Sequence, residues 1–158
     1  IVTWYALVDT AQDQDLHGLV KQSKQHGCLF SGKVPHALAA ASPHLVLADK
    51  REPLMKAWQE RGRAGNWGIF CESALKFDEL RRHFKKFLNA QLPDGTIALF
   101  RFYDPRVFNT YICACTAEER APWFKGVHRY LVQADDGVRH AYCLQDGQLF
   151  DGQRPVTA

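Results

Sequence analysis

Hydrophobic and polar positions predict strands that alternate with helices over roughly the first 125 residues. Residues 2–8 are rich in β-branched and aromatic side chains, which is typical of a buried strand. Leu16, Leu19 and Val20 share one face of a helix expected over 12–26. The segments predicted next are a short helix over 34–41, a short strand over 44–48, a helix over 53–61 and an apolar segment over 66–71.

The clearest helical pattern lies over residues 77–89. Its apolar side chains recur at the spacing of one helical face, and they are Phe77, Leu80, Phe84, Phe87 and Leu88. A Pro-Asp-Gly turn at 93–95 ends this region. The apolar run over 96–103 then predicts a central strand, and Asp104 followed by Pro105 predicts the start of another helix.

The pattern changes after Gly126, where three strand-like segments follow one another over 127–133, 138–144 and 148–150. We therefore expect an α/β fold, with a mixed, partly parallel sheet flanked by helices and a C-terminal antiparallel hairpin or meander. The domain boundaries expected from this pattern are 1–126 for the α/β domain, 127–151 for a meander packed on it or extending it, and 152–158 for a polar tail.

Composition narrows the class of protein. The 158 residues carry 20 Lys and Arg against 17 Asp and Glu, a net charge of +3, which is too small to indicate a nucleic-acid partner by itself. The positive charge is uneven, with a marked excess of Lys and Arg over residues 50–86. No apolar run approaches the length of a membrane helix, and residues 1–8 lack the basic start of a signal peptide. Five scattered cysteines favour free thiols in a cytoplasm.

Known catalytic motifs are missing from the sequence, including GxSxG, HExxH, the P-loop and GxGxxG. His140 and Cys143 have the nearest metal-ligand spacing, but a zinc site needs paired ligands, so we expect no metal and no cofactor. An enzyme of unrecognised type stays open, because a Cys–His pair can meet in space. The basic helix over 77–89 leaves nucleic-acid binding as a further alternative, although stacking aromatics are missing from its polar face.

Two aspartates stand at the ends of predicted strands, Asp9 after the first and Asp104 after the strand over 96–103. They could form a carboxylate pair for catalysis, since ligands gather at strand ends. The favoured interpretation is structural, because Arg101 is expected to be partly buried and a buried guanidinium needs a carboxylate partner. We therefore predict a structural brace made of Asp9, Arg101 and Asp104.

Residues 99–107, with the sequence LFRFYDPRV, resemble the signature of the type VI secretion effector-chaperone family, whose adaptor proteins are built on a domain formerly labelled of unknown function. Shorter segments match in order: YALVD at 5–9, LFSG at 29–32, SPHLV at 42–46, WG at 67–68, LRRHFKKFL at 80–88 and FKGV at 124–127. The resemblance runs from about residue 4 to residue 128. Thr10 departs from it, since a small residue or Gly is expected after the Asp.

The resemblance implies a non-enzymatic chaperone or adaptor in the bacterial cytoplasm. Such a protein binds a cognate type VI secretion effector, stabilises it and promotes its loading onto the secretion spike, which it contacts directly or through the effector. It implies no membrane partner.

A chaperone of this kind needs an exposed apolar groove or an open sheet edge. The residues expected to contact the partner are Trp123, Phe124, Arg106, Tyr103 and Trp58, because Trp, Tyr and Arg are common interface anchors. Trp123 follows Pro122 in a predicted loop, which favours its exposure. Phe124 and Trp67 could instead belong to the core.

Overall fold

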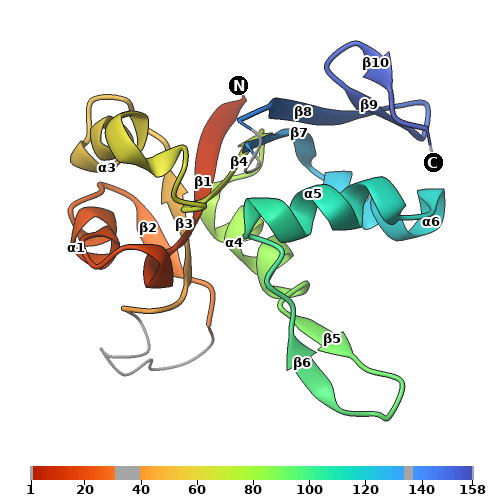
Figure 1. The fold of residues 1–158 in the computed structure, drawn as a ribbon, viewed down its shortest axis with the longest axis horizontal. Helices are drawn as coiled ribbons and strands as arrows, with labels where there is room; N and C mark the ends of the chain where they lie inside the picture. Colours follow the sequence, from red (N-terminus) through yellow and green to blue (C-terminus); the bar gives the residue numbers. More distant parts are fainter. Residues whose placement is uncertain (1, 31–39, 134–136, 158) are drawn as a thin grey trace.

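A computed structural model describes residues 2–30, 40–133 and 137–157. Within these residues, eight strands form one sheet in the order β10-β9-β8-β7-β4-β1-β3-β2, and β5 and β6 form a separate two-stranded sheet (Figure 1). The strands are β1 (Thr3–Asp9), β2 (His26–Cys28), β3 (Pro43–Leu47), β4 (Gly68–Ser73), β5 (Asn89–Gln91), β6 (Ile97–Leu99), β7 (Val127–Gln133), β8 (Arg139–Gln145), β9 (Gln148–Asp151) and β10 (Arg154–Pro155). The helices are α1 (Leu16–Lys21), α3 (Pro53–Ala57), α4 (Phe77–Lys85), α5 (Pro105–Ala114) and α6 (Ala117–Arg120), with short helical turns at η1 (Thr10–Gln12), η2 (Trp58–Gly62) and η3 (Ala121–Phe124).

The sheet is antiparallel, so the prediction of a mixed, partly parallel α/β sheet is wrong. Neighbouring strands are antiparallel at every pairing within the described residues. The chain leaves β1 through α1 and β2 and returns as β3 along one side of β1. It then crosses over through α3 and η2 to place β4 on the other side. Helical connections make parallel neighbours possible, but they equally allow a strand to return antiparallel beside its predecessor.

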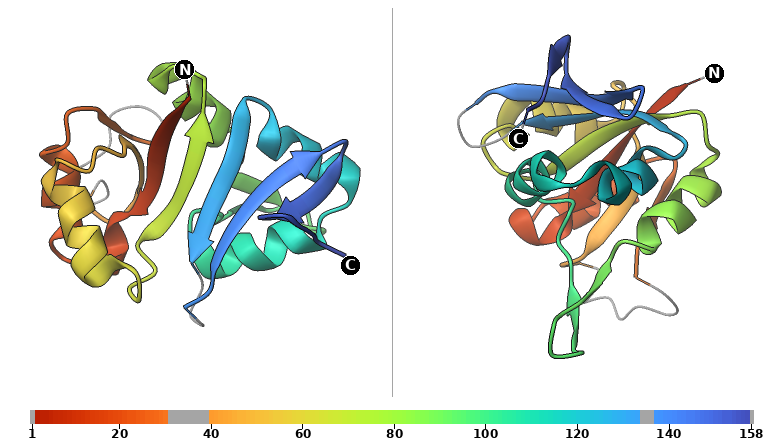
Figure 2. Two further views of the ribbon diagram at one scale, coloured as in Figure 1. Left: turned by 90° about the horizontal axis from the view of Figure 1, so that it is seen from above. Right: turned by 90° about the vertical axis from the view of Figure 1, so that its right-hand side faces the viewer.

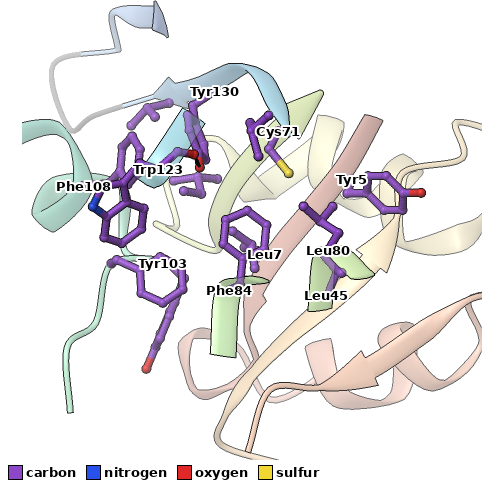
Figure 3. Close-up of a cluster of buried hydrophobic side chains, with 14 of the residues drawn as sticks. Tyr5, Leu7, Leu45, Cys71, Leu80, Phe84, Tyr103, Phe108, Trp123 and Tyr130 are labelled. Carbon is purple, nitrogen blue, oxygen red and sulfur yellow. Dashed lines mark hydrogen bonds between the residues drawn. The ribbon is translucent and has the colours of Figure 1, made fainter. Parts of the chain in front are cut away.

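The side of the sheet that packs on α4 and α5, here called the inner face, carries the larger core. Tyr5 and Leu7 of β1 point to this side, as do Cys71 of β4 and Tyr130 of β7 (Figure 3). They meet the apolar stripe of α4 predicted from the sequence, in which Phe84 is fully buried. The helix over 77–89 is therefore confirmed in its main part, while its last residue, Asn89, begins β5.

The opposite, outer face of the sheet is covered over only part of its width. Ala6 and Val8 of β1 and Val46 of β3 pack there against Leu54 of α3 and Leu16 of α1. The outer side of β7, β8 and β9 carries no helix from the described parts of the chain, as the left view of Figure 2 shows. At β4, Trp58 of η2 packs on the outward-facing Phe70 with ring centroids 4.6 Å apart, so the helical cover of the outer face ends there.

The predicted central strand over 96–103 is the second error. Only Ile97–Leu99 is a strand, and it pairs with β5 in the hairpin that projects from the body of the protein (Figure 1). Phe100 and Phe102 leave this strand to join the aromatic core, where Phe102 is fully buried. The apolar run therefore reflects core residues in an irregular segment rather than a strand buried on both faces.

The other predicted elements lie close to their expected positions, with local differences. The helix expected over 12–26 is helical only at Leu16–Lys21, and its end is taken by β2. The helix over 34–41 falls almost wholly outside the described residues, and 40–41 form a turn. Strands β7, β8 and β9 follow the predicted meander and continue the main sheet through the β4–β7 pairing. The expected tail contains β10, which pairs with β9.

Candidate partner-binding surface

The signature segment is tied to the first strand through Asp9. The Asp9 carboxylate is 3% exposed and accepts a 2.7 Å hydrogen bond from Nη2 of Arg101. It also accepts from the backbone N–H of Ala11 at 3.1 Å and from Nε2 of Gln12 at 3.0 Å. The Arg101 side chain is 49% exposed, which agrees with the expected partial burial, although it follows the hairpin instead of lying in a central strand.

Asp104 belongs to a second, separate pair. Its carboxylate caps α5 by accepting from the backbone N–H of Arg106 at 2.9 Å, and the Arg106 guanidinium binds both of its oxygens at 3.1 and 2.8 Å. Burial by itself would raise the pKa of the Asp104 carboxyl, but the hydrogen bonds from Arg106 hold it below its ordinary value. The structure therefore joins Asp9 to Arg101, as the predicted brace requires, but pairs Asp104 with Arg106, which was not part of that brace.

Trp123 is buried, so the expectation that it is an exposed anchor is wrong. Its side chain is 2% exposed and stacks on Phe87 at a centroid distance of 3.9 Å. The physical reason is local. Pro122 lies within the 3₁₀ turn η3, which folds Trp123 back under the core instead of presenting it on a loop. The Tyr130 hydroxyl donates to the Trp123 carbonyl and fixes this turn against β7 (Figure 3).

The other aromatic candidates are also held by the core to different degrees. Tyr103 is 2% exposed, and its burial, with the neighbouring Asp9 charge, raises its pKa to about 12. Phe124 is partly buried against Tyr130. Trp58 is 6% exposed but borders a cleft described below, so it keeps access to a ligand. Arg106 retains half of its side-chain surface.

A candidate surface lies on the outer face of the sheet beyond β1. Phe70 of β4, Leu131 of β7 and Ala141 of β8 lie side by side across neighbouring strands, and each is only partly buried. Further out, Cys143 of β8 lies opposite Phe150 of β9, and both side chains are also partly buried. No sequence pattern indicates this face, because identifying it requires knowing which strands the helices leave uncovered.

A cleft of about 390 Å³ lies where the covered and uncovered parts of the outer face meet. Trp58, Trp67 and Phe70 form its aromatic lining, with ring centroids of Trp58 and Trp67 5.8 Å apart in an edge-to-face arrangement. Gly62 makes this packing possible, since a Cβ there would lie 2.8 Å from both indole rings, and Gly68 lets β4 approach β1, since a Cβ there would lie 1.8 Å from the carbonyl oxygen of Leu7. The cleft therefore lies between the helix–strand connection over residues 53–68 and the strands β1, β4, β7 and β8.

A second apolar surface is the projecting hairpin of β5 and β6. Leu92, Ile97 and Leu99 are 44%, 67% and 47% exposed, and they are the most exposed large apolar side chains of the described residues together with Val2 and Val138. Leu99 and Ile97 share one side of β6, because alternate residues of a strand point the same way. A two-stranded hairpin is marginally stable alone, so its apolar side chains are available to a partner.

Other sequence candidates are engaged elsewhere or do not assemble. Arg81 of the basic helix α4 donates its guanidinium to the Cys28 carbonyl, with Nε at 2.7 Å, instead of facing solvent. His140 forms a hydrogen bond with Asp151, in which Nδ1 lies 2.6 Å from Oδ2, instead of forming a metal site with Cys143. In the described part of the chain, no three His, Cys, Asp or Glu side chains are grouped to hold a metal ion. Likewise, no helix there has the length and apolar character needed to cross a membrane.

Comparison with known proteins adds one finding to this geometry. A protein-family model described as "domain of unknown function (DUF4123)" matches residues 4–122, three-quarters of the chain. This chain belongs to the DUF4123 family. The family is associated with effector adaptors of type VI secretion, which agrees with the resemblance drawn from LFRFYDPRV. No match was found among curated proteins or among solved structures.

The DUF4123 match divides the candidate surface into two parts. It includes the Asp9–Arg101 pair, the projecting hairpin and the aromatic lining of the cleft. It ends at Pro122, before β7, β8 and β9, which provide most of the uncovered outer face. The surface open to a partner is thus made jointly by the DUF4123 region and by the strands that follow it.

Proposed function

We propose that this protein is a non-enzymatic chaperone and adaptor that binds a cognate type VI secretion effector in the bacterial cytoplasm, stabilises it and promotes its loading onto the secretion spike. One observation carries the proposal: among the described residues, no helix covers the outer face of β7, β8 and β9, which bears partly buried apolar side chains. Apolar side chains gathered on an open face, here Leu131, Ala141 and Phe150, favour a protein partner. Membership of the DUF4123 family, which is associated with effector adaptors of type VI secretion, supports an effector as that partner.

The test is co-expression with the product of the neighbouring effector gene, followed by affinity capture and size-exclusion chromatography. The proposal expects a stoichiometric complex and an effector that is soluble only when the two proteins are made together. An effector that is soluble alone and never co-elutes with the wild-type protein would refute it. Loading is tested by adding the spike protein to the purified complex, where a ternary peak is expected.

The part played by the outer face is tested with Ala141→Arg, which places a long cationic side chain on this face beside Leu131 without emptying the core. We expect this variant to keep its melting temperature and to lose effector capture by at least tenfold. Ala74→Arg is the matched control, because Ala74 is exposed in the connection after β4. Equal capture by the two variants would exclude the outer face as the contact.

A further inference from the structure

We propose that the cleft beside Trp58 and Trp67 binds an acidic amphipathic segment of the protein partner, in which apolar side chains enter the cleft and Asp or Glu side chains meet its rim. The proposal rests on the proposed function, since it supposes a protein partner. It adds what that function leaves open, which is the chemistry of the recognised segment and the place where it is recognised.

The lining of the cleft fits apolar side chains. Trp67 is 2% exposed and Trp58 is 6% exposed, so both are rigidly held by the surrounding core while one surface of each borders the open volume. Met55 of α3 and Leu131 of β7 lie on the opposing walls. The volume of about 390 Å³ falls within the range of about 300–1,000 Å³ typical of ligand-binding pockets, which is enough for one or two large side chains.

The rim of the cleft is basic. Lys50, Arg63 and Arg139 line it from three different connections and strands, and each is exposed. Among the described residues that line the cleft, none is Asp or Glu. Neighbouring arginines outside the cleft are instead paired, with Arg61 3.2 Å from Asp13 and Arg129 3.1 Å from Glu72. Three basic groups around an apolar lining complement a segment that carries acidic residues beside apolar ones.

The backbone departs from regular strand and helix geometry on two sides of the cleft. The β4–β7 ladder ends at the Phe70–Leu131 pair, although β4 begins at Gly68 and β7 continues to Gln133. The two strands are therefore not paired with each other along the cleft. On the other side, α3 widens into the π-helical turn η2, from Trp58 to Gly62, a rare geometry that often marks binding sites. Both departures widen the space that the partner segment would enter.

The first experiment compares effector capture by two triple variants of equal charge. Lys50→Glu/Arg63→Glu/Arg139→Glu reverses the rim of the cleft. Arg82→Glu/Lys125→Glu/Arg154→Glu reverses three exposed basic residues elsewhere and changes the net charge by the same amount. We expect the rim variant to lose affinity for the effector at least tenfold and the control variant to change less than threefold, with both keeping the wild-type melting temperature. Equal loss by the two variants, or no loss by either, overturns the proposal.

The second experiment does not depend on the effector, so a failure of the proposed function can be told from a failure of this inference. A capped ten-residue peptide with alternating pairs of Leu or Phe and Asp or Glu is titrated into the wild-type protein, and tryptophan fluorescence is recorded. Trp4, Trp58 and Trp67 line the cleft, whereas Trp123 lies in the core on the inner face. We expect saturable binding that weakens with salt and is lost in the rim variant. Equal binding of a peptide with Lys in place of the acids overturns the proposal.

Discussion

Removal of the Arg101 guanidinium is the sharpest test of the signature segment, because it separates a structural from a partner-binding role. Arg101 is the only donor to Asp9, among those that the structure describes, that comes from a distant part of the chain, since Ala11 and Gln12 follow Asp9 directly. Arg101→Ala therefore leaves the 3% exposed carboxylate with two neutral local donors. The first strand and the signature segment lose their direct polar link.

The cost can be estimated from the geometry. A hydrogen bond between charged groups contributes about 1.5–3 kcal/mol to stability, and the 49% exposure of the Arg101 side chain reduces that value by solvent screening. We expect Arg101→Ala to lower the free energy of unfolding by about 1–2 kcal/mol. For a chain of 158 residues this corresponds to a decrease in melting temperature of about 2–8 °C.

The assay is thermal and urea unfolding of Arg101→Ala, Asp9→Asn and the double variant, which form a double-mutant cycle. A structural pair gives a coupling energy of about 1 kcal/mol or more. Arg51→Ala is the control, because Arg51 is 90% exposed and its pair with Asp49 should leave the melting temperature unchanged. A wild-type melting temperature together with lost effector binding would refute the structural role of Arg101 and make it a partner contact.

Three further predictions concern pH, packing and the projecting hairpin. Burial lowers the pKa of His44 to about 4 despite its hydrogen bond to a backbone carbonyl, so the unfolded chain takes up the proton first as pH falls. The contribution of His44 to the free energy of unfolding is therefore fully present above pH 6.5 and decreases by about 3 kcal/mol as pH falls from about 6.5 to about 4. The measurement is urea unfolding of wild type and His44→Gln over this pH range. Gly68→Ala should destabilise by more than about 2 kcal/mol or prevent folding, since its Cβ would collide with the Leu7 carbonyl, and a soluble variant of wild-type melting temperature would contradict this. Ile97→Ser/Leu99→Ser should keep the melting temperature within about 2 °C but weaken effector capture, whereas unchanged capture would exclude the hairpin from the interface.

The sequence was sufficient for elements defined by neighbouring residues. Helix α4 was predicted because its apolar spacing is a local property, and the cap of α5 because Asp104 and Pro105 are adjacent. Strand pairing was not predicted correctly, since β1 meets β3 and β4 across long connections that the sequence pattern does not orient. The apolar run over 96–103 led to the wrong prediction of a central strand, because buried residues of an irregular segment and of a strand have the same apolar composition.

The candidate surface was less accessible to sequence reasoning than the fold. The sequence does not decide on which side of η3 Trp123 lies, and its burial results from packing against aromatic side chains that are distant in sequence, such as Phe87 and Phe102. The cleft arises where β4 and β7 are not paired, which has no local signature. One sequence signal did point toward it, since the basic excess over residues 50–86 contains Lys50 and Arg63 of its rim.

The central position of β1 has a consequence for synthesis on the ribosome. β1 leaves the ribosome before both of its sheet neighbours, β3 and β4, and its register joins Asp9 to Pro43 and Thr3 to Ser73, so its pairing is complete only after both have been synthesised. β4 in turn waits for β7, which follows the whole signature segment. Such non-local pairing slows folding and leaves an apolar strand exposed in the growing chain. The nascent protein therefore has a period in which it needs protection itself, and its solubility during expression should depend on the translation rate through residues 74–126.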